Sequence, residues 1–141
     1  MLFRSVISCP PGADAVAVRA AVEAGARGLV LEGSGSGNLP PLIADAVTQL
    51  AHDHPEIVVV SSSRVPRGEA TSTYGGHGGG AELATRGVLS CGYLRSGQAR
   101  VLLAALLSTI DTAGGDVAET DAAVRVAAEV RRSWPRYHLY N

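Results

Sequence analysis

A glycine-rich segment in the first third of the chain has the composition of a ligand-binding loop. Glycines alternate with serines from Gly33 to Gly37, and Asn38 follows at once. Because glycine has no side chain, the backbone amides of such a loop can approach a ligand closely, and the Asn38 carboxamide can hydrogen-bond a small carboxylate. Three interpretations are open: a tight turn that serves the fold, a carboxylate contact through Gly35, Gly37 and Asn38, and a nucleotide-binding loop. Against the last, Pro40 stands where a dinucleotide fingerprint has its third glycine.

Polar groups also follow a later apolar run. Three serines, Ser61 to Ser63, are followed by Arg64. In a functional interpretation, the planar guanidinium of Arg64 binds a carboxylate through two parallel N–H donors. In a structural interpretation, the serine hydroxyls satisfy backbone groups of a loop and Arg64 forms a surface salt bridge. Both interpretations are open at this point.

A second glycine-rich segment surrounds a histidine. The sequence from Tyr74 to Gly80 reads YGGHGGG. Tyr74 can fold over a ligand as part of a lid, or it can anchor the loop. His77 suggests a catalytic or metal-binding role, but no second His, Cys or Asp stands at ligand spacing. We therefore interpret His77 as a mobile surface histidine that lines the site if the chain is catalytic, and we expect neither a metal nor a cofactor.

Two cysteines, Cys9 and Cys91, are far apart in the sequence and form no CxxC motif. Two cysteines do not make a disulfide scaffold in a chain of this size. Cys91 follows an apolar run and could be a nucleophile, but no partnered base is evident. We expect both to be buried, free thiols in a reducing compartment.

The elements that carry these residues alternate between strands and helices. Short apolar runs predict strands, and apolar residues at helical spacing between them predict helices. The expected strands are 2–8, 28–31, 57–60 and 88–92, and the expected helices lie between Asp14 and Gly25, over 39–51, 81–85 and 96–108, and from a Thr120 cap to 132. This order predicts an α/β domain: a three-layer, open parallel sheet of about four strands with helices on both faces.

Both glycine-rich segments follow expected strands. Because the carboxyl ends of parallel strands share one edge of the sheet, and ligands bind at that edge, we expect both loops to lie there. Residues 61–80 show no regular pattern, and structureless loops of about this length inside a compact domain are often functional. We therefore predict an active or binding surface formed by residues 33–39 and 61–80.

Composition excludes several classes of function. The length of 141 residues and the hydrophobic fraction of 46% fit a single packed domain, residues 1–141. Basic and acidic residues balance at 12 against 13 with no basic patch, so we expect no nucleic-acid partner. None of the basic residues is lysine, which excludes Schiff-base chemistry within this chain. No signal peptide or membrane-spanning stretch is visible, so we expect a soluble, cytoplasmic protein without a membrane partner.

Four ordered motifs resemble the C-terminal domain of the L-asparaginase family of amidohydrolases. They are AGARGLVLEGSGSGNLP at 24–40, VVVSSSRVPRG at 58–68, YGGHGGGAEL at 74–83 and QARVLL at 98–103. The agreement in order and spacing extends from about residue 4 to residue 108. The resemblance implies a parallel-sheet domain that packs into intimate dimers and tetramers and lends residues to a neighbouring subunit's active site. One of these residues is an asparagine that matches Asn38.

The resemblance also indicates which catalytic residues of the family lie outside this C-terminal domain. In the family, the two threonines of the nucleophile site, an Asp and a Lys belong to an N-terminal domain, so hydrolysis of asparagine by this chain alone is not expected. Some members place a glutamate in the long loop, where this chain has the Tyr74–Gly80 segment instead. That glutamate therefore has no assigned counterpart here.

Three functional hypotheses follow. In the first, the chain is part of a split L-asparaginase-type amidohydrolase and completes the active site of a separate N-terminal half. In the second, it is an independent homo-oligomeric enzyme or binder of a small amino-acid or carboxylate ligand. In the third, it is a non-catalytic oligomerisation module. The sequence is also compatible with a truncated piece of a longer protein.

Overall fold

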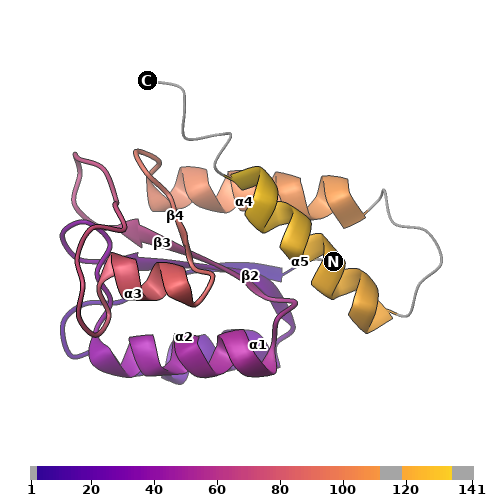
Figure 1. The fold of residues 1–141 in the computed structure, drawn as a ribbon, viewed down its shortest axis with the longest axis horizontal. Helices are drawn as coiled ribbons and strands as arrows, with labels where there is room; N and C mark the ends of the chain where they lie inside the picture. The colour runs from indigo at the N-terminus through magenta and orange to yellow at the C-terminus, as the bar shows by residue number, and fades with distance from the viewer. Residues whose placement is uncertain (1–2, 112–118, 135–141) are drawn as a thin grey trace.

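The computed structural model describes residues 3–111 and 119–134, and a parallel β-sheet lies at its centre (Figure 1). Four strands lie in the order β1-β2-β3-β4, and every neighbouring pair is parallel. The strands are β1 (Phe3–Ser8), β2 (Ala26–Gly33), β3 (Val58–Ser63) and β4 (Leu89–Ser90). The predicted open parallel sheet of an α/β domain is confirmed.

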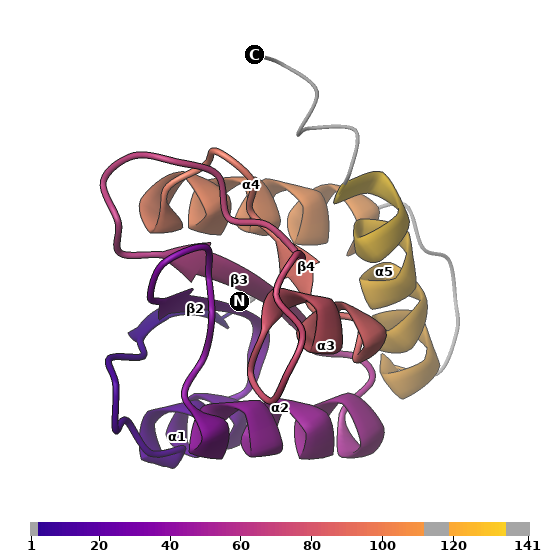
Figure 2. The same ribbon diagram turned by 60° about the vertical axis from the view of Figure 1, so that its left-hand side comes forward.

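Helices cover both faces of this sheet, as predicted. They are α1 (Val16–Glu23), α2 (Pro41–Asp53), α3 (Gly80–Thr85), α4 (Ser96–Asp111) and α5 (Glu119–Ser133). The order β1-β2-β3-β4 means that each new strand joins the same edge of the growing sheet. Because the crossovers between parallel strands are right-handed, α1, α2 and α3 then lie on one face. The other face is covered by α4 and α5, and Figure 2 shows the three layers.

Each face of the sheet has its own apolar core. Leu29 and Leu31 of β2 pack with residues of α1 and α2, whereas Val30 packs with residues of α4 and α5, and all three are fully buried. Burial on both faces explains the unbroken apolar runs of the inner strands. At the end of α5, the buried Trp134 donates its indole N–H to Ser90 O at 2.8 Å and so ties this helix to β4.

The strand order does not reverse within this sheet. In open α/β sheets, a ligand crevice forms where neighbouring crossovers leave on opposite faces, which requires a reversal. The carboxyl edge of this sheet is therefore shaped by its loops, which lie together at the left of Figure 1.

Some predicted boundaries were wrong. The strand β3 continues through Ser61–Ser63, where we expected a loop, because each hydroxyl finds a hydrogen-bond partner and the serines can be buried. The strand β4 has only two residues, because Gly92, with a φ of 59°, turns the chain and its carbonyl accepts from Ala70 N. Helix α5 begins at Glu119, so Thr120 lies inside it.

Other predictions concern helix ends and chain ends. Asp14 accepts a hydrogen bond from Val16 N at 3.0 Å, and Gly25 follows α1 with a φ of 85°, as expected for a helix stop. Within the described residues, no helix combines the length and the hydropathy that crossing a bilayer requires. The aromatic tail after Pro135, for which we considered docking, lies outside the described residues.

Candidate functional site

The first glycine-rich loop is a closed turn at the carboxyl end of β2. Ser34 N donates to Asn38 O at 3.0 Å, and Asn38 N donates back to Ser34 O at 2.9 Å. Gly37 N also donates to Ser34 O, at 3.0 Å. Gly35 and Gly37 have φ values of 57° and 99°, in the left-handed region that glycine favours. The backbone therefore has the geometry of the tight-turn interpretation.

This geometry opposes phosphate binding. The amides of Ser34, Gly37 and Asn38 are already used inside the turn. At the start of α2, Pro40 and Pro41 have no N–H to donate, so this helix end lacks the amides that bind anions elsewhere. The nucleotide-binding interpretation has no support in the structure.

The two glycine-rich loops meet at the carboxyl edge of the sheet, as predicted. Hydrogen bonds join the first loop to the end of β3 and to the long loop that follows it. They are Ser63 Oγ to Gly35 O at 2.5 Å, Arg64 N to Gly33 O at 3.0 Å, Thr71 N to Ser36 O at 3.0 Å and Leu39 N to Gly78 O at 2.9 Å. The segments 33–39 and 61–80 therefore form one connected surface.

Two side-chain oxygens of the first loop are buried without a partner. Asn38 Oδ1 and Ser36 Oγ make no hydrogen bond within the described residues. Leaving a buried polar group unpaired costs about 1–3 kcal/mol, so such groups in native proteins normally bind water, a ligand or another chain. These two oxygens are thus groups of the first loop that have no hydrogen-bond donor within the described residues.

Arg64 and Tyr74 lie on the solvent side of the same edge. The Arg64 side chain is exposed and forms no ion pair within the described part of the chain, so the surface salt bridge of the structural interpretation is absent there. The Tyr74 side chain is 59% exposed, and the loop is held at this point by Tyr74 O, which accepts from Ala81 N at 3.0 Å. Burial of the ring therefore does not anchor the loop.

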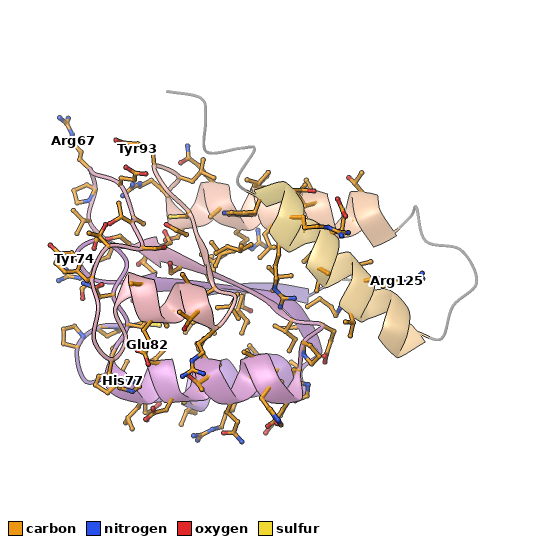
Figure 3. All side chains as sticks on the ribbon, viewed as in Figure 1. Arg67, Tyr74, His77, Glu82, Tyr93 and Arg125 are labelled. Carbon is orange, nitrogen blue, oxygen red and sulfur yellow. The ribbon has the colours of Figure 1, made fainter. Side chains whose placement is uncertain are left out.

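His77 faces away from this group. Its Nε2 lies 2.8 Å from Asp45 Oδ1 of α2, and its Nδ1 lies 3.2 Å from Glu82 Oε1 of α3. Figure 3 shows His77 beside Glu82 at the amino-terminal end of α2, well separated from Tyr74. The structure therefore does not bring together all the residues that we expected to line one site. His77 is at the surface as expected, but two carboxylates hold it.

The contact between His77 and Glu82 shifts the pKa of both side chains. The hydrogen bond to Glu82, and then the charges of Glu82 and Asp45, raise the pKa of His77. A hydrogen bond from Gly78 N at 2.7 Å, followed by the one to His77, lowers the pKa of Glu82. Glu82 could have been noticed in the sequence, since acidic residues in a first helical turn often bind free amides. Asp45, on another helix, carried no such signal.

Comparison with known proteins decides the family. The family profile described as the glutaminase/asparaginase C-terminal domain matches residues 5–117. This chain belongs to that family. An L-asparaginase from Bacillus licheniformis is 35% identical over 104 residues, which are 74% of this chain and 32% of the relative. A probable L-asparaginase from Deinococcus radiodurans is 39% identical over 83 residues, which are 59% of this chain and 24% of the relative. This asparaginase C-terminal domain thus matches a third or less of the length of these relatives.

Sequence reasoning missed Arg95, which clamps part of the candidate surface of the asparaginase C-terminal domain. Its guanidinium donates to Val65 O, to Gly68 O at 2.6 Å and to Tyr93 O at 3.3 Å. These carbonyls lie in the segment after Arg64 and in the segment after β4. A single planar donor group thereby fixes the backbone on both sides of it. No sequence motif predicted that Arg95 would bind these carbonyls.

A buried polar chain was also missed. The Ser96 hydroxyl, at the start of α4, donates to Glu32 Oε2 of β2, and it lies 3.1 Å from Ser62 Oγ of β3. Ser62 is fully buried and Ser96 is 6% exposed. A carboxylate beside a helix N-terminus is favoured by the helix dipole. The polar chain of Glu32, Ser96 and Ser62 holds the ends of β2 and β3 to α4 and thus supports the loops that follow both strands.

The two thiols are buried and free, as predicted. Burial, with a contribution from the charge of Glu32, raises the pKa of Cys9 to about 11. Burial also raises the pKa of Cys91. A nucleophilic cysteine needs its thiolate form, so neither residue has the environment of a nucleophile at neutral pH. Within the described residues, no group of His, Cys, Asp and Glu side chains could hold a metal ion.

Proposed function

We propose that this domain is part of a split L-asparaginase-type amidohydrolase and completes the active site of a separate N-terminal half. The observation that carries the proposal is the Asn38 carboxamide: its oxygen is buried without a partner, on a loop at the carboxyl edge of the sheet. The family membership and the two L-asparaginase relatives support the reaction class. The match to only 32% and 24% of those relatives supports the need for a second half.

The residues of this chain suit substrate binding better than the bond-breaking steps of amide hydrolysis. Amide hydrolysis of this kind needs a nucleophile and a base that activates it. The chain has no lysine, and its two cysteines have raised pKa values. As the family resemblance implies, we assign the nucleophile and the base to the other half. The part left for this domain is to bind and orient a small amino-acid substrate.

Asn38 suits that task because a carboxamide both accepts and donates. Its oxygen can accept from an ammonium group, and its nitrogen can donate to a carboxylate. Gly35 has no side chain beside the carboxamide, since an added Cβ there would lie 3.8 Å from Asn38 Nδ2. Arg64 and Tyr74, exposed on the same edge, are placed to contact the substrate or the other half.

The test is reconstitution. The chain is used as bait in its native cell extract, and a stoichiometric partner that carries asparaginase-like threonines and a lysine is expected. Ammonia release from L-asparagine is then measured for the chain, the partner and their mixture, and only the mixture should be active. If the bait returns only itself, or if the mixture is no more active than the partner alone, the proposal is wrong.

Variants define the role of Asn38 within the active mixture. We expect Asn38→Ala to lower kcat/KM by about tenfold to a hundredfold, the effect of losing a hydrogen bond to a charged group. Asn38→Asp keeps the shape but repels a carboxylate, so it should be at least as harmful. Arg64→Ala tests the second contact, with Arg125→Ala as its matched control, since Arg125 is an exposed arginine on α5 far from the loops (Figure 3).

A homo-oligomeric ligand binder is the second candidate, and one observation favours it. The outer side of α4 has an open, mainly apolar groove of about 750 Å³, and Val101 within it is 63% exposed. Apolar exposure of this kind is typical of an interface. A mass measurement in solution, repeated with Val101→Asp, tests it: a dimer that the substitution dissociates would support this reading, and a monomer would exclude it.

A further inference from the structure

His77 differs from the other described histidines in what it connects. The pairs His52–Asp53 and His54–Glu56 join residues that are close neighbours in the chain, at 2.7 and 3.0 Å. His77 instead has a carboxylate at each ring nitrogen, one from α2 and one from α3. It therefore joins two helices to the glycine loop between β3 and α3.

Hydrogen bonds connect His77 to the residue that follows Asn38, by way of Glu82 and Gly78. The carboxylate of Glu82 that contacts His77 also accepts from Gly78 N at 2.7 Å. The carbonyl of Gly78 then accepts from Leu39 N at 2.9 Å, and Leu39 is the residue after Asn38. A Cβ at Gly78, whose φ is 83°, would overlap Leu39 O, so the two segments are in close contact. Movement of Gly78 would therefore disturb its hydrogen bond to Leu39, at the end of the Asn38 turn.

Protonation of the histidine changes what it can hold. A protonated imidazole ring has two N–H donors and can donate to Asp45 and Glu82 together. A neutral ring has one N–H, so its other nitrogen presents a lone pair to a carboxylate, and one of the two contacts becomes repulsive. The bridge between α2 and α3 is therefore complete only in the protonated state.

We propose that His77 and Glu82 form a pH-sensitive latch that positions Asn38, closed while His77 is protonated and loosened when it is neutral. Glu82 and His77 act here as positioning residues through Gly78 and Leu39. The latch itself is a property of this chain, and only its consequence for catalysis rests on the proposed function.

The charges around His77 define the pH range. Asp45 faces it from α2, Glu82 faces it from α3, and Arg86 acts on Glu82 from further along α3. The pKa of His77 is raised, so its contribution is complete below the ordinary histidine pKa of about 6.5 and is lost as pH rises through the higher folded value. The pKa of Glu82 is lowered, so its contribution is complete above the ordinary glutamate pKa of about 4.3 and is lost on acidification. The latch is closed between these limits.

Amide hydrogen exchange by NMR on the full chain tests the latch. The protection factors of Gly78 N and Leu39 N are measured from about pH 5.5 to about pH 8, on either side of the ordinary histidine pKa. We expect them to fall about two- to fivefold with rising pH, the range of a single exposed charge pair. The side-chain NH₂ signals of Asn38 and the ring signals of His77 should shift with the same midpoint.

Matched variants separate the latch from general stability. His77→Gln should remove the pH dependence and leave both amides weakly protected, whereas His77→Arg, charged throughout, should keep them protected at high pH. His52→Gln removes a paired histidine at the far end of α2 and should behave as the wild type. If His77→Gln does not fold, the wild-type titration still tests the latch. The His77 ring signals, the Asn38 NH₂ signals and the amide protection must then share one midpoint. Protection that is constant with pH, or that changes equally in His77→Gln, would overturn the proposal.

The latch and the proposed function fail in different ways. If the amides respond to pH as expected but Asn38→Ala leaves the reconstituted activity unchanged, the latch stands and the catalytic assignment of Asn38 falls. If Asn38→Ala lowers activity while the amides show no response to pH, the latch falls and the assignment stands.

Discussion

Leu39 N donates a hydrogen bond to Gly78 O at 2.9 Å. The two residues belong to different glycine-rich loops, after β2 and after β3, and this bond joins the loops at the carboxyl edge of the sheet. Asn38 precedes Leu39 and His77 precedes Gly78, so each lies one residue along the chain from this bond. Their side chains nevertheless face different surroundings, since His77 lies between Asp45 and Glu82.

The contact between the loops predicts a strict need for glycine at Gly78. A side chain there would overlap Leu39 O, and the φ of 83° is unfavourable for any other residue. We expect Gly78→Ala to lower the free energy of unfolding by about 1–3 kcal/mol or more, as strained backbone positions do. Gly75→Ala is the matched control, because a Cβ at Gly75 meets nothing within 4 Å, and it should change stability by less than about 0.5 kcal/mol. Chemical denaturation measures both, and equal effects would contradict the prediction.

The Arg95 clamp predicts sensitivity to a change of shape at constant charge. Lysine cannot reproduce the planar fork that donates to Val65 O, Gly68 O and Tyr93 O. We expect Arg95→Lys to speed tryptic cleavage after Arg64 and Arg67 several-fold, because protease access follows local opening of the segment. Arg100→Lys, on the exposed side of α4, should leave the cleavage rate unchanged. Cleavage that is equally slow in both variants would show that the clamp does not hold the segment.

The polar chain below the loops predicts a stability loss on removal of one hydroxyl. Ser96→Ala removes the hydroxyl that donates to Glu32 and contacts Ser62, and Ser62 is fully buried. The free energy of unfolding should fall by about 1–3 kcal/mol, the cost of leaving buried polar groups unpaired. Ser72→Ala, at an exposed position of the long loop, should fall within about 0.5 kcal/mol of the wild type. A neutral effect of Ser96→Ala would mean that water replaces the lost hydroxyl.

The raised pKa of Cys9 predicts both low reactivity and a stability loss in alkali. Burial moves its pKa from 9.0 to about 11, so the folded state is favoured while the thiol is protonated. That contribution is complete below pH 9 and decreases as the pH rises toward 11. Near neutral pH, the folded protein should react with a thiol reagent at least about a hundredfold more slowly than the denatured protein, since its thiolate fraction is that much smaller. Equal rates in the two states would contradict burial, and Cys9→Ala should remove its part of the alkaline loss.

Much of the fold could be predicted because its signals are local. The apolar run around Val58–Val60 indicated a strand buried on both faces, and Gly25 marked the end of a helix. The serines at 61–63 were assigned to a loop because polar residues rarely fill a buried strand. Their hydroxyls find partners in Leu89 O, Ser96 Oγ and Gly35 O, all from segments distant in the sequence, so no local pattern could show that they belong to β3.

For the candidate surface, the order of strands and glycine-rich segments was enough to predict which loops meet. Parallel strands share a carboxyl edge, so glycine-rich segments after β2 and β3 had to lie together. The ordered motifs also determined the family, since they depend on residue identity and spacing alone.

The directions in which the side chains of those loops face depend on the packing of the folded domain. His77 turned to α2 and α3 because Asp45 and Glu82 stand there, and Asn38 Oδ1 was left buried without a partner because the turn uses the backbone amides around it. Arg95 became the clamp of the Arg64 segment because the start of α4 packs beside that segment. Each of these outcomes depends on pairs far apart in the chain, and pairings of that kind form only when the sheet and its helices bring them within hydrogen-bond distance.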